Sequence, residues 1–232
     1  MKGRGIEEHP RGTFLSDFIL GSQDGLVNVL GILLGLVAAG ASHSLILVAA
    51  FAALAAESIS MGAVAYTSTL ARRLLYLSEV ERERAEMRTV PEMEREEVRV
   101  ILRKWGYQGA EVEEMLQRIE AKPQAMLDIM MAFELNLAEV PASAPFYSFL
   151  TVLLATIVGS FIPLLPFLLL PAALATAAYI SIGLSAIMLA IVGWYEARTT
   201  LGITWKSAIR MVAIGLGAGF AGFLVGHFLG AA

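Results

Sequence analysis

The 232-residue sequence contains no cysteine and only three histidines, His9, His43 and His227. Without cysteine, the chain can form no disulfide bond and offers no thiolate ligand to a metal. Three scattered histidines also exclude a His-rich metal site. Any metal chemistry in this protein has to rest on other side chains.

Charged residues are scarce outside one stretch of the chain. Residues 71–140 hold 15 of the 21 acidic and 11 of the 17 basic residues, and the formal net charge is −4. Hydrophobic residues make up 57% of the sequence, above the roughly 45–50% of a soluble globular chain. The mean hydropathy is +0.68. These values predict an all-α, polytopic membrane protein with one polar insertion, and they give no reason to expect a nucleic-acid partner.

Five apolar segments are long enough to cross about 30 Å of hydrocarbon as helices. They are residues 15–39, 45–70, 147–168, 171–194 and 207–229. The first is too long for a secretory signal peptide, and no small-residue cleavage site follows it. The sequence therefore predicts three parts: residues 1–70 with a tail and two transmembrane helices, 71–140 as a cytoplasmic helical insertion, and 141–232 with three transmembrane helices.

Lysine and arginine are unevenly distributed among the connections. The N-terminal tail carries Lys2, Arg4 and Arg11, and the connections after the second and fourth spans are also basic. The connections after the first and third spans carry no Lys or Arg. The positive-inside rule therefore places the N-terminus, the insertion and residues 195–206 in the cytoplasm and the C-terminus outside. Nothing in the sequence indicates a eukaryotic organelle, so we expect a prokaryotic plasma membrane, or a vacuolar membrane if the source is eukaryotic.

The insertion is expected to be helical. The helix of the second span continues without a breaker to about Thr89, and Pro91 starts a new helix because proline suits a first helical turn. That helix is expected to end near Gly106. A third short helix ends at Pro123, and a fourth, from Gln124, runs into the third span.

Three acidic residues lie within or near the first two spans. Asp17 and Asp24 are seven residues apart and share one face of the first helix, where Asn28 follows. Glu57 and Met61 share a face of the second helix in the same way. An ionised carboxylate inside a membrane costs several kcal/mol unless it lines a wet path or has a partner. Asp17 alone fits an interfacial structural role equally well, but Asp24 and Glu57 together favour a cation or proton path.

A methionine one helical turn from an acid indicates which class of cation the path through the membrane carries. A thioether is a soft ligand that suits Fe²⁺, Cu⁺ and other transition metals, and it does not suit Na⁺, K⁺, Mg²⁺ or Ca²⁺. The pair of Glu57 and Met61 therefore favours a divalent transition metal. The signal is a weak one by itself, because methionine is common in apolar helices.

The insertion contains the same two ligand types at helical spacing. Two pairs of glutamates are three residues apart, and one methionine precedes a glutamate by four, so each pair shares a helix face. For a single glutamate, a solvated and salt-bridged helix face is the simpler interpretation. Together, the pairs favour an oxygen-rich site with one thioether, fit for several divalent ions. These candidate ligands are Glu83, Glu86, Glu94, Glu97, Met130 and Glu134.

Small residues recur in the first and fifth spans as Gly-x-x-x-Gly pairs. Such pairs let two membrane helices approach closely, and they make a homodimer plausible. The pairs are Gly21/Gly25, Gly31/Gly35, Gly215/Gly219 and Gly222/Gly226.

Four stretches of the sequence resemble the vacuolar iron transporter family. They are DFILGSQDGLVNVLGILLGL in the first span, ESISMG in the second, PQAMLDIMMAFELNL before the third and GSFIPLLP within it. The resemblance implies five spans, a cytoplasmic metal-binding domain between the second and third, and a homodimer. It also implies export of Fe²⁺ from the cytosol in exchange for protons, with Mn²⁺ and related ions carried by some members.

The resemblance also assigns roles to residues. It implies that the six candidate ligands of the insertion collect the metal. It implies that Asp17 admits the ion from the cytoplasmic side and that Asp24, Glu57 and Met61 pass it across the membrane. Asp24 or Glu57 would also bind the proton.

The sequence thus predicts a divalent-metal/proton antiporter without a prosthetic group. The residues do not rank Fe²⁺ against Mn²⁺, Co²⁺, Ni²⁺ or Zn²⁺. One alternative is a membrane-anchored di-iron ferroxidase, but such sites normally use Glu-x-x-His motifs and the insertion has no histidine. A second alternative is a metal sensor or storage module that the spans merely anchor, and the acids within the spans argue against it.

Overall fold

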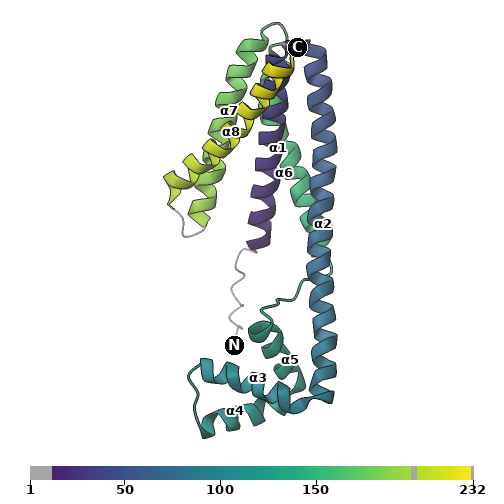
Figure 1. The fold of residues 1–232 in the computed structure, drawn as a ribbon, viewed down its shortest axis with the longest axis vertical. Helices are drawn as coiled ribbons and strands as arrows, with labels where there is room; N and C mark the ends of the chain where they lie inside the picture. The colour runs from purple at the N-terminus through teal and green to yellow at the C-terminus, as the bar shows by residue number, and fades with distance from the viewer. Residues whose placement is uncertain (1–11, 200–202, 231–232) are drawn as a thin grey trace, which may run out of the picture. The chain divides into compact units, whose positions relative to one another are not determined.

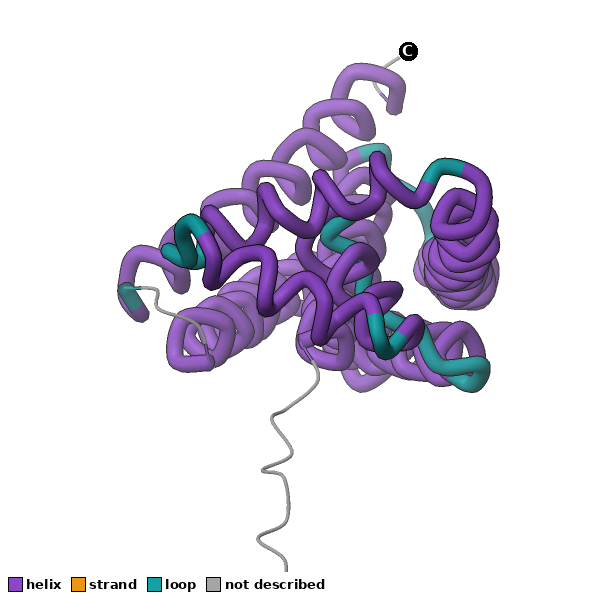
Figure 2. The backbone as a smooth tube through the Cα atoms, turned by 90° about the horizontal axis from the view of Figure 1, so that it is seen from below, coloured by secondary structure: helices purple, strands orange, loops and turns teal. Residues whose placement is uncertain are grey.

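The computed structural model describes residues 12–199 and 203–230. These residues form helices joined by short loops, and no strand occurs in the described ranges (Figure 2). The basic residues Lys2, Arg4 and Arg11, on which part of the predicted topology depends, lie outside the described residues. The elements are α1 (Gly12–Ala38), α2 (His43–Thr89), α3 (Pro91–Lys104), α4 (Ala110–Glu120), α5 (Pro123–Ile129), the π-helix η1 (Met130–Glu134), α6 (Ala144–Leu169), α7 (Leu174–Thr199) and α8 (Thr204–Gly230).

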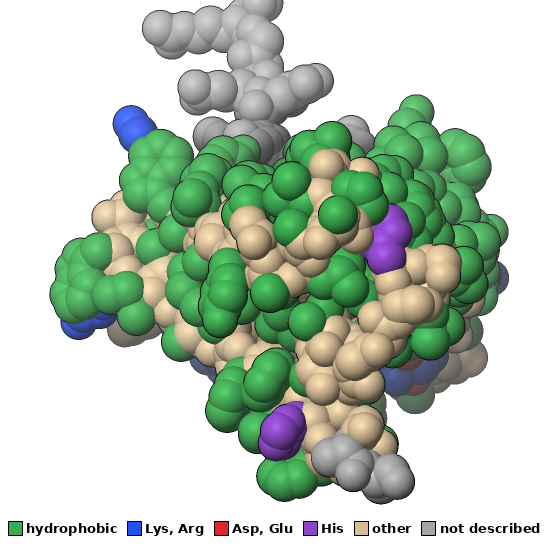
Figure 3. Space-filling view, turned by 90° about the horizontal axis from the view of Figure 1, so that it is seen from above, with side chains coloured by type: hydrophobic (Ala, Val, Ile, Leu, Met, Phe, Trp, Pro, Cys, Tyr) green, Lys and Arg blue, Asp and Glu red, His purple; other side chains and the backbone are tan. Residues whose placement is uncertain are grey.

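Five of these helices are long and apolar enough to cross a membrane, which confirms the predicted number of spans. They are α1, α2, α6, α7 and α8 (Figure 1). In the end-on view of Figure 3, hydrophobic side chains are interspersed with backbone and other groups, and few charged side chains are visible.

The chain divides into two compact units. We call Met1–Tyr66 with Phe146–Ala232 the membrane unit and Thr67–Pro145 the polar unit. The 47-residue helix α2 contributes to both, because it continues through residues 71–89 as the sequence predicts.

Close helix contacts in the membrane unit depend on glycine. A Cβ atom at Gly21 would lie 2.6 Å from the Val152 carbonyl oxygen of α6, and one at Gly35 would lie 2.9 Å from the Gly222 oxygen of α8. Gly226 approaches the backbone of Gly35 in the same way. The glycine pairs therefore serve packing between helices of one chain, and they no longer support a homodimer.

Helix α6 contains two prolines, Pro163 and Pro166, and continues through both to Leu169. The carbonyl of Phe167 lies in the last turn of α6, and the residue four positions on, Pro171, has no N–H to donate to it. The imidazole Nε2 of His43 donates to this carbonyl at 2.9 Å, which satisfies it from α2.

The predicted helix boundaries of the polar unit are largely confirmed. Helix α2 ends at Thr89, Pro91 opens α3, and Gly106 follows α3 with a φ of 99°. The fourth predicted helix was wrong in its extent, because it ends at Glu134 and does not run into α6. Asn136 has a φ of 53°, a left-handed conformation that asparagine tolerates and that terminates a helix.

Candidate functional site

Two of the three acids in the first two spans, Asp24 and Glu57, share one asparagine as hydrogen-bond donor. The side-chain amide of Asn28 donates to Asp24 Oδ1 at 3.3 Å and also to Oε1 of Glu57 on α2. The carboxyl groups of Asp24 and Glu57 lie within hydrogen-bonding range of each other. Two carboxylates this close repel one another unless a proton or a cation lies between them. The arrangement can therefore hold either a proton or a metal ion.

Asp17 is held separately from this group. Its Oδ2 accepts a hydrogen bond of 2.6 Å from the hydroxyl of Ser148, a buried residue at the start of α6. Met61 lies one turn beyond Glu57 on α2 and is half-buried. Sequence reasoning did not single out Ser148, because nothing in the local pattern marks it as a partner of α1.

Two buried serine hydroxyls of the membrane unit lie on the helix of Glu57 or against the helix of Asp24. Ser58 follows Glu57 directly and Ser160 approaches the backbone of Gly25, next to Asp24. Within the described residues, neither Oγ has a hydrogen-bond partner. Unpartnered hydroxyls are costly inside a membrane, so these two are further candidates for contact with water or an ion.

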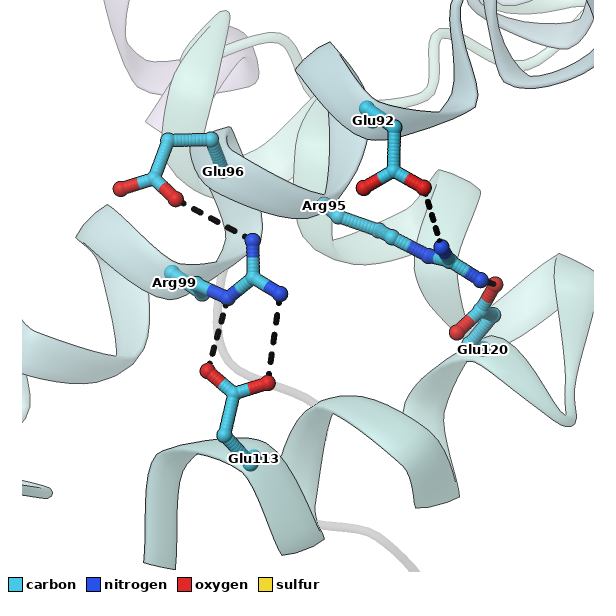
Figure 4. Close-up of polar contacts among 6 residues, drawn as sticks. All are labelled: Glu92, Arg95, Glu96, Arg99, Glu113 and Glu120. Carbon is cyan, nitrogen blue, oxygen red and sulfur yellow. Dashed lines mark hydrogen bonds and ion pairs between the residues drawn. The ribbon is translucent and has the colours of Figure 1, made fainter. Parts of the chain in front are cut away.

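In the polar unit, one set of glutamates forms ion pairs with arginines. Arg99 binds Glu113 through two N–H groups, at 2.8 and 3.2 Å, and Glu96 at 3.1 Å (Figure 4). Arg95 joins Glu92 and Glu120 in the same way (Figure 4). These ion pairs link α3 to α4 and correspond to the salt-bridged helix face expected of alternating Glu and Arg.

A second set of glutamates is gathered in one place, and two of its members are buried. Single carboxylate oxygens of Glu83, Glu86 and Glu94 lie within 4.8 Å of one another, and they come from α2 and α3. Glu83 and Glu94 are each only 1% exposed. The carboxyl groups of Glu97 and Glu134 are hydrogen-bonded to each other, which brings η1 to the same group. We call these five residues the glutamate cluster.

Burial and mutual repulsion raise the pKa of carboxyl groups in the glutamate cluster, and a bound cation would relieve that repulsion. Burial raises the pKa of Glu94 to about 7, and the carboxylates of Glu97 and Glu83 add to the rise. Burial also raises the pKa of Glu134 to about 7, with Glu97 and Glu83 again adding to it. The pKa of Glu97 is raised mainly by its burial, although its hydrogen bond with Glu134 acts in the opposite direction.

The donor set of the glutamate cluster fits a divalent metal. One oxygen each of Glu83, Glu94 and Glu134 is buried without a hydrogen-bond partner among the described residues. Buried carboxylate oxygens are rarely left without a partner, so such atoms need an explanation such as an ion. Oxygen ligands suit Mn²⁺ and Fe²⁺ as well as harder cations.

Met130 lies four residues before Glu134 of the glutamate cluster, and it also packs in the hydrophobic core of the polar unit. It is 0% exposed and belongs to a core with Val98, Leu102 and Leu116. Because it opens the π-helix η1 and Glu134 closes it, the two residues remain on one turn. π-Helical turns recur at functional sites, so the turn itself is consistent with a ligand role for Met130.

Comparison with known proteins identifies the family of this chain. The model of the VIT family matches residues 15–227. "Vacuolar iron transporter 1" of Arabidopsis thaliana is 35% identical over 212 residues, covering 91% of this chain and 84% of the relative. The protein of the same name from Eucalyptus grandis is 34% identical, covering 91% and 85%. "Vacuolar iron transporter 2" of Oryza sativa subsp. japonica is 33% identical over 224 residues, covering 94% and 90%. These relatives are transporters and not enzymes, and this multi-pass membrane protein belongs to the VIT family.

Proposed function

We propose that this protein is a proton-coupled antiporter that removes Fe²⁺ from the cytosol, with Mn²⁺ as a second candidate substrate. The observation that carries the proposal is the contact of Asp24, Asn28 and Glu57 between two membrane-spanning helices. Acids inside a membrane mark ion or proton paths. The names of the relatives supply the metal, since they are iron transporters.

Carboxylates suit both ions of such an exchange. A carboxylate binds the metal only when it is deprotonated, so protonation expels the metal and metal binding releases protons. We propose that the glutamate cluster collects the metal from the cytosol and that Asp17 admits it to the path. Asp24, Glu57 and Met61 then pass it, and Asp24 or Glu57 carries the returning proton.

The proposal is tested by metal flux into proteoliposomes. Vesicles with an acidic interior hold a metal-quenched dye, and Fe²⁺ is added outside with ascorbate to keep it reduced. Glu57→Gln and Asp24→Asn should abolish uptake, because each removes a carboxylate from the path. Glu114→Gln, a change on the exposed face of α4 where Glu114 pairs with Arg118, should leave it unchanged. Uptake at the wild-type rate by both path variants would rule out the assigned path.

The proposed orientation has the polar unit in the cytoplasm and the C-terminus outside. Because the chain has no cysteine, single cysteines can be introduced without further changes. A membrane-impermeant maleimide should label Gln117→Cys from the cytoplasmic side only and Ser42→Cys from the other side only. Labelling of both from one side would contradict the five-span topology.

A homodimer remains part of the proposal, supported by the family resemblance and not by the glycine pairs. Helices α2 and α8 keep large exposed apolar faces, which include Ile59, Val64 and Phe220. Lipid or a second copy can cover such faces. Light scattering of the detergent-solubilised protein distinguishes one chain from two.

A further inference from the structure

Arg82 on α2 lies among three acidic side chains of its own helix. Its Nη2 is 2.8 Å from Glu79 Oε2 and 3.1 Å from Glu83 Oε1, and its Nε is 3.6 Å from Glu86 Oε2. Glu83 and Glu86 belong to the glutamate cluster, whereas Glu79 lies one turn before it. Arg82 thus contacts two candidate metal ligands and one acid outside the candidate metal group.

The burial of these side chains is unequal. The side chain of Arg82 is 49% exposed, whereas those of Glu79 and Glu83 are 20% and 2% exposed. The guanidinium can therefore leave Glu83 without leaving water, but Glu83 cannot turn to water for a replacement. Glu83 Oε1 is bound by Arg82, and its Oε2 has no hydrogen-bond partner within the described part of the chain.

A salt-bridged helix surface is the simpler interpretation of Arg82, and such exposed pairs contribute little. Two observations go beyond it. One partner, Glu83, is almost completely buried. The positive charge of Arg82 also acts on Glu97 and Glu134, which come from α3 and η1. Arg82 therefore acts on four of the five residues of the glutamate cluster, Glu83, Glu86, Glu97 and Glu134, and not only on one helix face.

Arg82 and a divalent metal compete for the same carboxylates. An arginine keeps its charge at any physiological pH, so it cannot be removed by deprotonation. Like charges a few ångströms apart repel strongly in a partly buried site. For the metal to bind Glu83 through both oxygens, Arg82 has to move away, and Glu79 is the acid that can receive it.

We propose that Arg82 is a built-in counter-cation of the glutamate cluster. It neutralises Glu83 and Glu86 while no metal is bound, and it moves onto Glu79 when a divalent cation enters. The consequence is a weaker metal site that releases its ion readily, as a collection site needs to do. The inference rests on the proposed role of the glutamate cluster in collecting metal.

The test is a calorimetric titration of the full-length protein in detergent with Mn²⁺, which is stable in air. Arg82→Gln should raise the affinity about tenfold, because a repelling unit charge is lost. Arg82→Lys should stay near the wild type, since it keeps the charge, and it also guards against a folding defect of the glutamine variant. Arg84→Gln is the matched control, because Arg84 pairs with the exposed Glu81 and should leave the affinity unchanged.

A substitution at Glu79 distinguishes the proposed role of Arg82 from the alternative that Glu79 itself binds the metal. Glu79→Gln should weaken Mn²⁺ binding in the wild-type background, because Arg82 then has no other acid to receive it. The same change should have no effect in the Arg82→Gln background. An equal loss in both backgrounds would make Glu79 a metal ligand and overturn the counter-cation role.

Two further outcomes separate a failure of the inference about Arg82 from a failure of the proposed metal collection by the glutamate cluster. If Arg82→Gln leaves the affinity unchanged or lowers it while Glu94→Gln abolishes binding, the cluster collects metal but the inference about Arg82 is wrong. If the wild type binds no Mn²⁺ and Glu94→Gln changes nothing, the collection role of the cluster fails, and the inference fails with it.

Discussion

The side-chain amide of Asn28 on α1 donates a hydrogen bond to the carboxyl group of Glu57 on α2. The two residues come from different membrane-spanning helices, and the same amide also reaches Asp24. Asn28 therefore positions two acids against each other without supplying a charge of its own.

Replacing Asn28 should impair transport although it is not acidic. Asn28→Leu keeps a similar volume but leaves the Glu57 oxygen without its donor, which costs about 1–3 kcal/mol. We expect Fe²⁺ uptake into proteoliposomes to fall about tenfold or more. Leu20→Ala, an exposed change on the same helix, is the control and should transport normally. Wild-type rates for Asn28→Leu would show that the amide does not position the path.

Metal binding by the glutamate cluster should depend on pH near neutrality. Burial raises the pKa of Glu94 and of Glu134 to about 7, so both groups are largely protonated below that pH in the metal-free protein. Bound metal requires the carboxylate form, so its binding should release protons. The affinity for Mn²⁺ should therefore fall as the pH is lowered from about 8 to about 6. Calorimetry in buffers of different ionisation enthalpy measures the released protons directly.

The raised pKa of Glu94 also predicts how the stability of the folded protein changes with pH. The folded-state pKa of Glu94 lies above its usual 4.5, so the folded protein holds more protons than the unfolded chain between these values. Stability of the metal-free polar unit should thus decrease as the pH rises from about 4.5 to about 7. Saturating Mn²⁺ should offset the loss, and Glu94→Gln should flatten the curve. Thermal unfolding with a pH-independent midpoint would contradict the burial of this carboxyl.

Met130 can be tested as a ligand apart from its packing role. Met130→Leu nearly conserves volume and should cost less than about 1.5 kcal/mol of stability. If the thioether binds metal, the affinity for Fe²⁺ should fall more than that for Mn²⁺, the harder ion. Met126→Leu is the matched control, because Met126 lies in the same core at 4% exposure. An equal effect of the two changes would leave Met130 with a packing role only.

The contact between α1 and α8 should be sensitive to single methyl groups. Gly222 lies directly against the backbone of Gly31, so Gly222→Ala forces the helices apart and should destabilise the protein by about 1–3 kcal/mol. Gly217, on the same helix, has nothing within 4 Å of an added Cβ. Gly217→Ala should be neutral or slightly stabilising. Thermal unfolding in detergent compares the two, and similar midpoints would contradict the observed helix contact.

The membrane spans and the first helices of the polar unit were predictable, because they depend on local patterns. Long apolar runs mark the five spans, Pro91 marks a helix start, and Gly106 marks a stop. The fourth helix was overextended because Asn136 was not recognised as the residue that takes a left-handed conformation. Its neighbours are apolar and suit a helix, so periodicity alone gave no reason to stop there.

The candidate sites were also predictable only where they depend on spacing along one helix. Helical spacing correctly placed Asp24 and Asn28 on one face and grouped Glu83 with Glu86. Spacing on one helix does not reveal which helices meet, so the bond from Asn28 to Glu57 and that from Ser148 to Asp17 were not predicted. Arg82 was overlooked because alternating Glu and Arg indicate an ordinary solvated face, and only burial distinguishes Glu83 from its neighbours.

Proton-coupled antiport can be tested by recording metal entry and internal pH at the same time. Proteoliposomes with an acidic interior would carry one dye for metal and one for pH, and Fe²⁺ or Mn²⁺ would be added outside. If the protein exchanges metal for protons, metal should enter, the interior should become less acidic as it does, and Glu57→Gln should stop both signals together. Metal entry at the same rate without a pH gradient, and with no change in internal pH, would contradict proton-coupled antiport.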